Sequence, residues 1–424
     1  MGASSTAIRN IRSRKPIIGR LRGIRDPPTR TGFSSQRATA HNLSQTLRAR
    51  RALAVVLLGL LIFVLARDGG PRRFNLRPTT FNQLSGWADD RISAAVPAFL
   101  ASCARFVTRP AAAPLDATAM SAYFGRVGDW QALCKSAEAL PSGDDAAARR
   151  FFEADFVPLA VSDDGTAAGL FTGYFEIELH GSRRRHGRYQ TPIYCRPPEL
   201  GSKPQPTRAE IEDGALAGRG LELLWVDDPV DAFFLQIQGS GRVRLRSGRT
   251  IRIGYDGQNR QPYVPVGRLL IVRGLIPREQ LTMASIRTWM RKYPAAGAAL
   301  RREDPSYVFF REIRGDGPVG AEGVVLTPQR SLAVDRAFIA LGTPIWLEAE
   351  ERFTHAEDVR RLVVAQDTGG AIKGPVRGDV FWGTGNTAGI RAGEMNATGR
   401  YYLLLPRGVA TRLAPGHLPP PPAD

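Results

Sequence analysis

Three aspartates in the last quarter of the chain lie beside glycines and short apolar runs. Asp335 ends the run LAVD, Asp367 opens the stretch DTGGAIKG, and Asp379 opens DVFWG. Carboxylates at the ends of β-like segments, with glycines that let a bulky ligand approach the backbone, suit general acid–base chemistry. Aspartate and glycine are also ordinary turn residues, whose carboxylates cap backbone N–H groups. For Asp335 and Asp367 the capping role stays an open alternative.

The tripeptide Asp367-Thr368-Gly369 also has the form of an aspartic protease loop. That chemistry requires two carboxylates that share a proton, and therefore two such loops or a homodimer. The chain contains no second DTG, and Gly370 follows where serine or threonine is expected. A dimeric aspartic protease is therefore kept only as an alternative.

The segments that position these carboxylates read as strands, because apolar residues alternate with polar residues or glycine. The alternation runs through 169–197 and 243–253, with a hairpin turn at Ser247-Gly248, and strand-like runs return at 306–313 and 330–406. Residues 208–217 and 277–293 read as helices, the second ended by Pro294. The sequence therefore predicts a mostly β C-terminal barrel with a second β unit inserted before it.

A helical part precedes these strands. From Ile92 to Phe106 apolar residues recur at spacings of three and four, and similar patterns run from Tyr123 to Ala137 and over 144–156. Cys103 and Cys134 fall on the first two patterns, so in an exported chain a disulfide between them would join two helices. Cys195 is then left unpaired, and nothing around it indicates a nucleophile.

The formal charge of +18 is concentrated at the N-terminus. Residues 1–51 hold twelve lysines and arginines against one acidic residue, which accounts for +11 of the total. This leaves no basic surface with a readout motif, so nucleic acid is not an expected partner. The uncharged run 52–66 follows, at the border between a secretory apolar region and a membrane span. We expect a signal peptide or signal anchor that exports the rest of the chain.

Six motifs in order make the chain resemble the membrane-bound lytic murein transglycosylase A family, whose C-terminal portion is the 3D module named for three aspartates. The motifs are FTGYFE (171–176), TPIYCRP (191–197), LQIQGSG (235–241), PSYVFF (305–310), RSLAVDR (330–336) and DTGGAIKG through FWGTG (367–385). The resemblance covers about 171–407. It implies a mainly β fold with a helical N-terminal cover: a double-psi β-barrel domain plus an inserted second β-barrel domain, with a groove between them for a glycan.

With this resemblance, the chain divides into seven predicted parts. These are a basic disordered tail (1–51), the signal or anchor segment (52–66), a helical part leading into the barrel (80–170), an inserted β-barrel substrate-binding domain (171–276), a helical connector (277–304), the double-psi catalytic domain (305–408) and a Pro-rich, unstructured tail (409–424).

The resemblance implies cleavage of the β-1,4 bond between N-acetylmuramic acid and N-acetylglucosamine in peptidoglycan, without water, to give 1,6-anhydromuramoyl ends. The family's single catalytic aspartate matches Asp379, and Asp367 and Asp335 are predicted as supporting carboxylates. In this reaction the tethered C6 hydroxyl of the sugar replaces water, so that one carboxyl serves first as acid and then as base. This requires the pKa of Asp379 to lie above its ordinary range.

Family correspondence places Thr172 and the stretch of Gln238, Gly239 and Ser240 against the glycan. The chemistry of their side chains and backbone adds Tyr174, Gly370 and Lys373 to the predicted substrate-binding residues. Tyr174 or Trp382 suits stacking on a sugar ring, although core packing explains either aromatic more simply when it is taken alone. No cofactor is expected, and no metal, because His180 and His186 are predicted on an exposed loop without partners at ligand spacing.

The expected location is the periplasm, with export or inner-membrane anchoring through 52–66 and no lipoprotein cysteine after that run. Peptidoglycan glycan strands are the expected partner, and cell-wall synthesis or division proteins are further candidates. A non-catalytic glycan-binding barrel, in which Asp379 has lost its role, is the main alternative function.

Overall fold

The computed structural model describes residues 74–117, 120–201, 205–315, 317–351 and 358–413. The segments 1–51 and 52–66, and residues 414–424 of the predicted tail, lie outside the described residues. Within the described ranges no helix has the length and apolar content that a membrane crossing requires.

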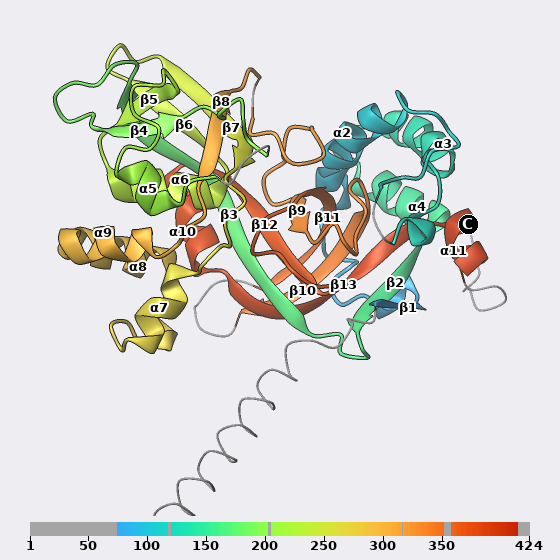
Figure 1. The fold of residues 1–424 in the computed structure, drawn as a ribbon. Coiled ribbons are helices and arrows are strands. Elements are labelled where there is room, and N and C mark those ends of the chain that lie inside the picture. Colours follow the sequence, from blue (N-terminus) through green and yellow to red (C-terminus); the bar gives the residue numbers. More distant parts are fainter. Residues whose placement is uncertain (1–73, 118–119, 202–204, 316, 352–357, 414–424) are drawn as a thin grey trace, which may run out of the picture. The chain divides into compact units, whose positions relative to one another are not determined.

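The predicted helical part is present at the N-terminal end of the described chain (Figure 1). It comprises β1 (Phe74–Pro78), the 3-10 turns η1 (Phe81–Gln83), η2 (Ile92–Ala95) and η3 (Ser121–Phe124), and helices α2 (Val96–Phe106), α3 (Val127–Glu138) and α4 (Asp145–Asp155). Asp144 accepts from the Ala147 N–H and so caps α4. A disulfide joins Cys103 on α2 to Cys134 on α3, as the helix patterns suggested.

Six strands pair into a closed ring that carries all three aspartates. Asp335 follows the end of β9, Asp367 ends β11, and Asp379 lies within β12. Around the ring they follow the order β13, β10, β11, β9, β12, β3 and back to β13. Their bounds are β3 (Gly169–Ser182), β9 (Ser331–Val334), β10 (Pro344–Glu351), β11 (Val359–Asp367), β12 (Arg377–Thr384) and β13 (Asn396–Pro406). The pairs β11–β9 and β12–β3 are parallel, and the other four are antiparallel. Strand β2 (Phe156–Asp163) extends the sheet from β13 to β1.

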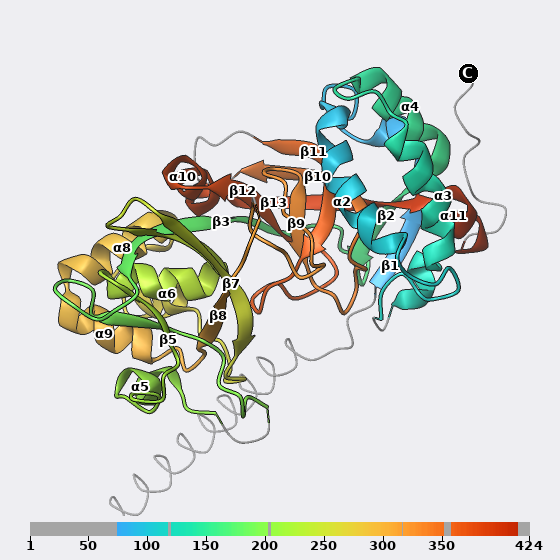
Figure 2. The ribbon, with the colours of Figure 1, turned by 90° about the horizontal axis from the view of Figure 1, so that it is seen from above.

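Strand β3 is shared between the ring and the inserted β region. Its first half pairs with β12, and from Ile177 onward it pairs with β6 and then β5. The predicted domain boundary at 171 therefore falls inside one continuous strand. Figures 1 and 2 show β3 leaving the ring towards β5, β6 and β7.

The inserted region is a branched sheet with helices around it. Its elements are β4 (Thr191–Tyr194), α5 (Arg208–Glu212), β5 (Glu222–Val226), α6 (Pro229–Gln238), β6 (Ser240–Leu245), β7 (Thr250–Gln258), α7 (Val266–Val272), η4 (Arg278–Gln280), α8 (Met283–Lys292), α9 (Pro294–Arg302) and β8 (Val308–Glu312). The predicted hairpin at Ser247-Gly248 joins β6 to β7. Pro294 follows the end of α8 but also begins α9, which fits the preference of proline for the first helical turn.

Two large apolar cores support these regions. One combines the ring interior with the helical part, as Val380, Leu332 and Phe99 illustrate. The other lies in the inserted region and includes Phe175 of β3 and Ala388 of α10 (Asn386–Glu394). Since β3 contributes to both cores, it couples the packing of the two regions.

The predicted tail at 409–424 is not unstructured from its start, so that expectation is wrong for residues 409–413. Helix α11 (Arg407–Leu413) follows β13 directly. Val409 and Ala410 are buried in the ring-side core, and Arg407 donates to the carbonyl oxygens of Ala154 and Phe156. Apolar burial and these hydrogen bonds offset the entropy of ordering one short helix.

Candidate active site

Asp379 lies near the start of β12, where this strand runs between β3 and β9. It is opposite Thr172 on the parallel neighbour β3 and opposite Ala333 on the antiparallel neighbour β9. Its Oδ1 accepts a hydrogen bond of 2.9 Å from the Thr172 hydroxyl. Two strands therefore fix the position of the Asp379 carboxyl.

Arg377 orients the hydroxyl that reaches Asp379. Its Nη2 donates to Thr172 Oγ1 at 2.8 Å, and its Nη1 donates to the Leu170 carbonyl oxygen at 3.2 Å. Because the Thr172 oxygen accepts from Arg377, its own proton is directed to Asp379. Arg377 thus holds the Thr172 hydroxyl in place, and its charge also acts on Asp379 directly. Within the described chain the two side chains are not close enough to form an ion pair.

Burial, together with a smaller contribution from the neighbouring Asp367 carboxylate, raises the pKa of Asp379 to about 6. The Arg377 charge and the Thr172 hydrogen bond act in the opposite direction, yet they are outweighed. A carboxyl with such a pKa holds its proton in a substantial fraction of molecules near pH 6, unlike an ordinary surface aspartate. Asp379 therefore has the property that a general acid requires.

Asp367 lies at the end of β11 and has three donors. Its Oδ2 accepts from the Tyr174 hydroxyl at 2.8 Å, and its Oδ1 accepts from the backbone N–H groups of Ala321 and Thr368, both at 2.9 Å. Burial nevertheless raises the pKa of Asp367. Thr172 and Tyr174 are two residues apart on β3 and so share a face, which brings Asp367 and Asp379 side by side.

Asp335 is placed differently, because its oxygens cap the backbone. Oδ1 accepts from the Ala337 N–H at 3.1 Å and Oδ2 from the Gly374 N–H at 2.8 Å. Gly374 has a φ of 112°, a conformation that glycine adopts without strain. Asp335 therefore holds the loop between Asp367 and Asp379, and its contacts match the capping alternative.

The predicted stacking role of Tyr174 does not match its surroundings. The ring is buried against Phe381, with centroids 5.3 Å apart, in a small core that also includes Ile372. Burial and the Asp367 carboxylate raise the pKa of Tyr174, so the hydroxyl stays protonated and donates a hydrogen bond to Asp367. In the structure Tyr174 is a partner of Asp367.

The predicted QGSG residues lie where β3 enters the inserted region. Gln238 is buried at the end of α6, and its Oε1 accepts from the Phe175 N–H at 3.0 Å. Gly239 ends α6 in the left-handed conformation, and Ser240, also buried, begins β6. Gln238 therefore supports β3 directly.

Gly370 and Lys373 are exposed on the loop between Asp367 and Asp379. Open space surrounds Gly370, since an added Cβ would meet no heavy atom within 4 Å. Trp382, on β12, is half-buried between Arg361 and Arg391, whose guanidinium carbons lie 5.8 Å from the ring centre. The structure thus brings Asp379, Asp367, Thr172 and Tyr174 together, with Gly370 and Lys373 on the adjoining loop.

Arg377 and the Ala321 N–H are parts of this cluster that the sequence analysis missed. Arg377 precedes Asp379 by two residues, so the period of a strand places it on the same face. Ala321 lies on a distant loop without a sequence signal. Among the described residues, no three His, Cys, Asp or Glu side chains gather as metal ligands. His180, predicted on a loop, is exposed but lies within β3.

The chain is similar to several known proteins. Family models of the MltA specific insert domain and the 3D domain match residues 170–311 and 330–405. The membrane-bound lytic murein transglycosylase A of Vibrio cholerae is 36% identical over 290 residues, which are 66% of this chain and 76% of that protein.

Two solved structures are similar over 80% of this chain. A membrane-bound lytic murein transglycosylase from Agrobacterium tumefaciens has 32% identity and a TM-score of 0.72, with 99% of its chain covered. Escherichia coli MltA with bound chitohexaose has 27% identity and a TM-score of 0.60, with 96% covered. The similarity therefore includes the helical part, where the sequence motifs are few.

Proposed function

Because the chain belongs to the membrane-bound lytic murein transglycosylase A family, we propose that it cleaves the β-1,4 bond between N-acetylmuramic acid and N-acetylglucosamine and leaves 1,6-anhydromuramoyl ends. It is an enzyme that acts on peptidoglycan. The E. coli relative binds chitohexaose, an oligomer of N-acetylglucosamine, which supports a glycan strand as the substrate here.

The observation that carries the mechanism is the partly protonated carboxyl of Asp379, with its pKa raised to about 6. In the first step this carboxyl gives its proton to the glycosidic oxygen, the bond from that oxygen to C1 of the muramoyl residue breaks, and positive charge develops at C1. In the second step the Asp379 carboxylate takes the proton of the C6 hydroxyl while O6 forms a bond to C1. The proton that Asp379 gives up in the first step is replaced in the second, so the protonated carboxyl is regenerated and no water is consumed.

The neighbours of Asp379 fit this cycle. The Thr172 hydroxyl can stabilise the carboxylate that exists between the two steps, because it donates to Oδ1. The Asp367 carboxylate opposes early loss of the proton and favours positive charge at C1 nearby. We assign Tyr174 and Arg377 the task of holding Asp367 and Thr172 in place, and Asp335 the task of holding the loop.

We further propose that the six-stranded ring is the double-psi β-barrel that the resemblance implies. Its two parallel pairs and its closed pairing support this assignment. The inserted sheet would form the second barrel, with the glycan held between the two near Thr172, Gly370 and Lys373. The relatives are named membrane-bound, which supports a place in the cell envelope; the periplasmic side and an anchor at 52–66 are part of the proposal.

The test is digestion of purified peptidoglycan by the wild type and by Asp379→Asn, with the products separated by chromatography and identified by mass spectrometry. We expect turnover to fall by a factor of about 10² to 10⁴, because general acid–base catalysis is lost. If the Asp379→Asn protein is folded and still binds glycan but has lost turnover, the role of Asp379 is in catalysis and not in folding or binding. If the wild type binds peptidoglycan and releases no fragment, the chain is a glycan-binding barrel and the proposal is wrong.

A further inference from the structure

A loop of residues 317–326 lies against the end of β11 and supplies a donor to Asp367. Its Ala321 N–H donates to Asp367 Oδ1 at 2.9 Å. The next amide, the Glu322 N–H, donates to the Gln366 carbonyl oxygen at 3.1 Å. Two successive N–H groups thus bind two successive residues of β11, and the direction of the Ala321 N–H depends on how the loop is held.

The Glu322 side chain fastens this loop to helix α2. The Ser102 hydroxyl of α2 donates to Glu322 Oε2 at 2.7 Å. Glu322 Oε1 is buried and has no hydrogen-bond partner among the described residues. The Ser102 hydroxyl and, to a smaller extent, the Gln366 amide stabilise the carboxylate form of Glu322. The loop is therefore attached by its backbone to β11 and by one side chain to α2.

The Ser102 hydroxyl is itself oriented by a buried chain of hydrogen bonds. Gln366 Nε2 donates to Ser102 Oγ at 2.9 Å and to the Ala98 carbonyl oxygen at 2.7 Å. Ser331 Oγ donates to Gln366 Oε1 at 2.6 Å. Because the Ser102 oxygen accepts from Gln366, its own proton is directed to Glu322. Ser102, Gln366 and Ser331 are all fully buried, so these bonds are stronger than bonds exposed to water.

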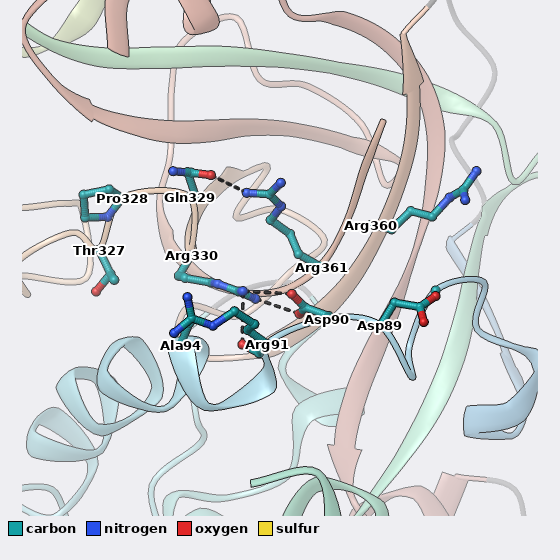
Figure 3. Close-up of a pocket in the computed structure, with 11 residues that line it drawn as sticks. Asp89, Asp90, Arg91, Ala94, Thr327, Pro328, Gln329, Arg330, Arg360 and Arg361 are labelled. Atoms are coloured by element: carbon teal, nitrogen blue, oxygen red, sulfur yellow. Dashed lines mark hydrogen bonds and ion pairs between the residues drawn. The ribbon is translucent and has the colours of Figure 1, made fainter. Parts of the chain in front are cut away.

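Helix α2 is a firm base for this contact, because the segment before it is also fastened to the ring. Figure 3 shows Arg330, which precedes β9, directed at Asp90, and two hydrogen bonds of 2.7 and 2.8 Å join them. The same guanidinium donates to the carbonyl oxygens of Arg91 and Leu362. Phe99 of α2 is buried in the ring-side core. A loop bonded to Ser102 is therefore held by an element that is fixed on β9 and β11.

We propose that Glu322 is a positioning residue for the reaction: through its bond to Ser102 it keeps the Ala321 N–H directed at the Asp367 carboxylate. The inference rests on the proposed function, in which the Asp367 carboxylate favours positive charge at C1. Glu322 acts on Asp367 through the loop that carries both Glu322 and Ala321. Weakening the bond between Ser102 and Glu322 should therefore change the state of Asp367.

The ionisation of Asp367 is the property that reveals this positioning. The Ala321 N–H favours the carboxylate and lowers the pKa of Asp367 against the effect of burial. A weaker bond from Ala321 raises that pKa, so a higher pH is needed to ionise Asp367. Because the proposed reaction uses Asp367 as the carboxylate, the acidic limb of the pH–rate profile then moves to higher pH.

The other ionisable groups around the two carboxyls stay the same in this test. Those that act on Glu322 or lie beside Asp367 are Arg105, Asp116, Tyr174 and Asp379. Burial raises the pKa of Glu322 to about 7, so Glu322 is mostly protonated at the lower pH of the acidic limb. A shift of that limb therefore reports on Asp367 and not on the titration of Glu322.

The experiment measures the initial rate of fragment release from purified peptidoglycan over a pH range that brackets the acidic limb. Ser102→Ala and Glu322→Met each remove one partner of the bond, and methionine keeps the length of the side chain. Glu322→Gln is the conservative variant, because its amide oxygen still accepts from Ser102. Ser93→Ala is the matched control: it removes a serine–carboxylate bond of the same kind, between η2 and Asp145 of α4.

We expect the acidic limb to move up by as much as about one pH unit in Ser102→Ala and in Glu322→Met, as weakening of one charge-assisted hydrogen bond to Asp367 predicts. The double variant should move it no further, because both changes break the same bond. Glu322→Gln and Ser93→Ala should keep the limb of the wild type.

An acidic limb that stays in place in Ser102→Ala overturns the inference, even if the rate falls equally at every pH. An equal shift in Ser93→Ala overturns it as well, since general loosening of the helical part would then be the cause. If Glu322→Met does not fold, Ser102→Ala decides the question, because it loses only one hydroxyl. A wild type that releases no fragment contradicts the proposed function instead.

Discussion

Replacing Thr172 by valine removes the only side-chain hydrogen bond that the described residues give to Asp379, while it keeps the size of the side chain. The Thr172 hydroxyl favours the carboxylate and so lowers the pKa of Asp379 against the effect of burial. Its loss leaves burial less opposed, and the pKa of Asp379 rises above its present value of about 6. The acid then stays protonated to higher pH.

The size of this effect follows from the bond that is lost. A hydrogen bond to a charged group is worth about 1.5 kcal/mol or more, and 1.36 kcal/mol corresponds to one pH unit. In Thr172→Val we therefore expect the alkaline limb of the pH–rate profile to move up by about one pH unit. The maximum rate falls as well, because the carboxylate formed after proton transfer loses its donor.

The assay is the initial rate of fragment release from purified peptidoglycan, measured at low substrate over a pH range that brackets the limb. Thr172→Ser is the matched control, since it keeps the hydroxyl and should keep the limb near that of the wild type. A limb that stays in place, or moves to lower pH, contradicts the reasoning. Arg377 would then have taken the place of the hydroxyl and paired with Asp379 directly.

Three further predictions concern stability. Replacing Cys103 and Cys134 together by serine lowers the free energy of unfolding by about 3 to 4 kcal/mol, as loss of a cross-link over 31 residues predicts; equal urea midpoints for the double variant and the wild type contradict this. Burial raises the pKa of Glu322 to about 7, against the opposing Ser102 hydrogen bond. The folded state thus binds this proton more tightly than the unfolded state, so the free energy of unfolding of the wild type falls by up to about 3 kcal/mol as the pH rises from about 5 to about 8. Urea unfolding of Glu322→Gln should show no such fall, and an equal fall in this variant contradicts the prediction. Asp335→Ala removes two caps and costs about 2 kcal/mol of unfolding free energy, whereas a stable variant with no turnover would give Asp335 a chemical role.

The elements around the site were largely predictable, because their signals are local. Period-two alternation identified the segment that forms β12, and the spacing of apolar residues identified α2 and α3. The motifs around Asp379 pointed to β12, the strand on which we propose the catalytic residue. The placement of Cys103 and Cys134 on two helix patterns allowed a disulfide in an exported chain, and the structure contains it.

The partners of the carboxylates were not predictable, since they come from distant segments. The Ala321 N–H reaches Asp367 across 46 residues, and no pattern marks it. In the sequence Tyr174 fits a stacking surface or, more simply, a core residue, and neither interpretation predicts its hydrogen bond to Asp367. Helix α11 was missed because the proline-rich residues after it dominate the local composition. Val409 and Ala410 of this helix are nevertheless buried in the ring-side core.

The measurement that tests the central claim most directly is digestion of peptidoglycan in ¹⁸O-labelled water, followed by mass spectrometry of the new muramoyl ends. If the C6 hydroxyl is the nucleophile and Asp379 carries the proton out and back, each new end lacks one water and contains no label. Labelled reducing ends from the wild type would show that water attacks C1, and the account of a single carboxyl acting in both steps would be wrong.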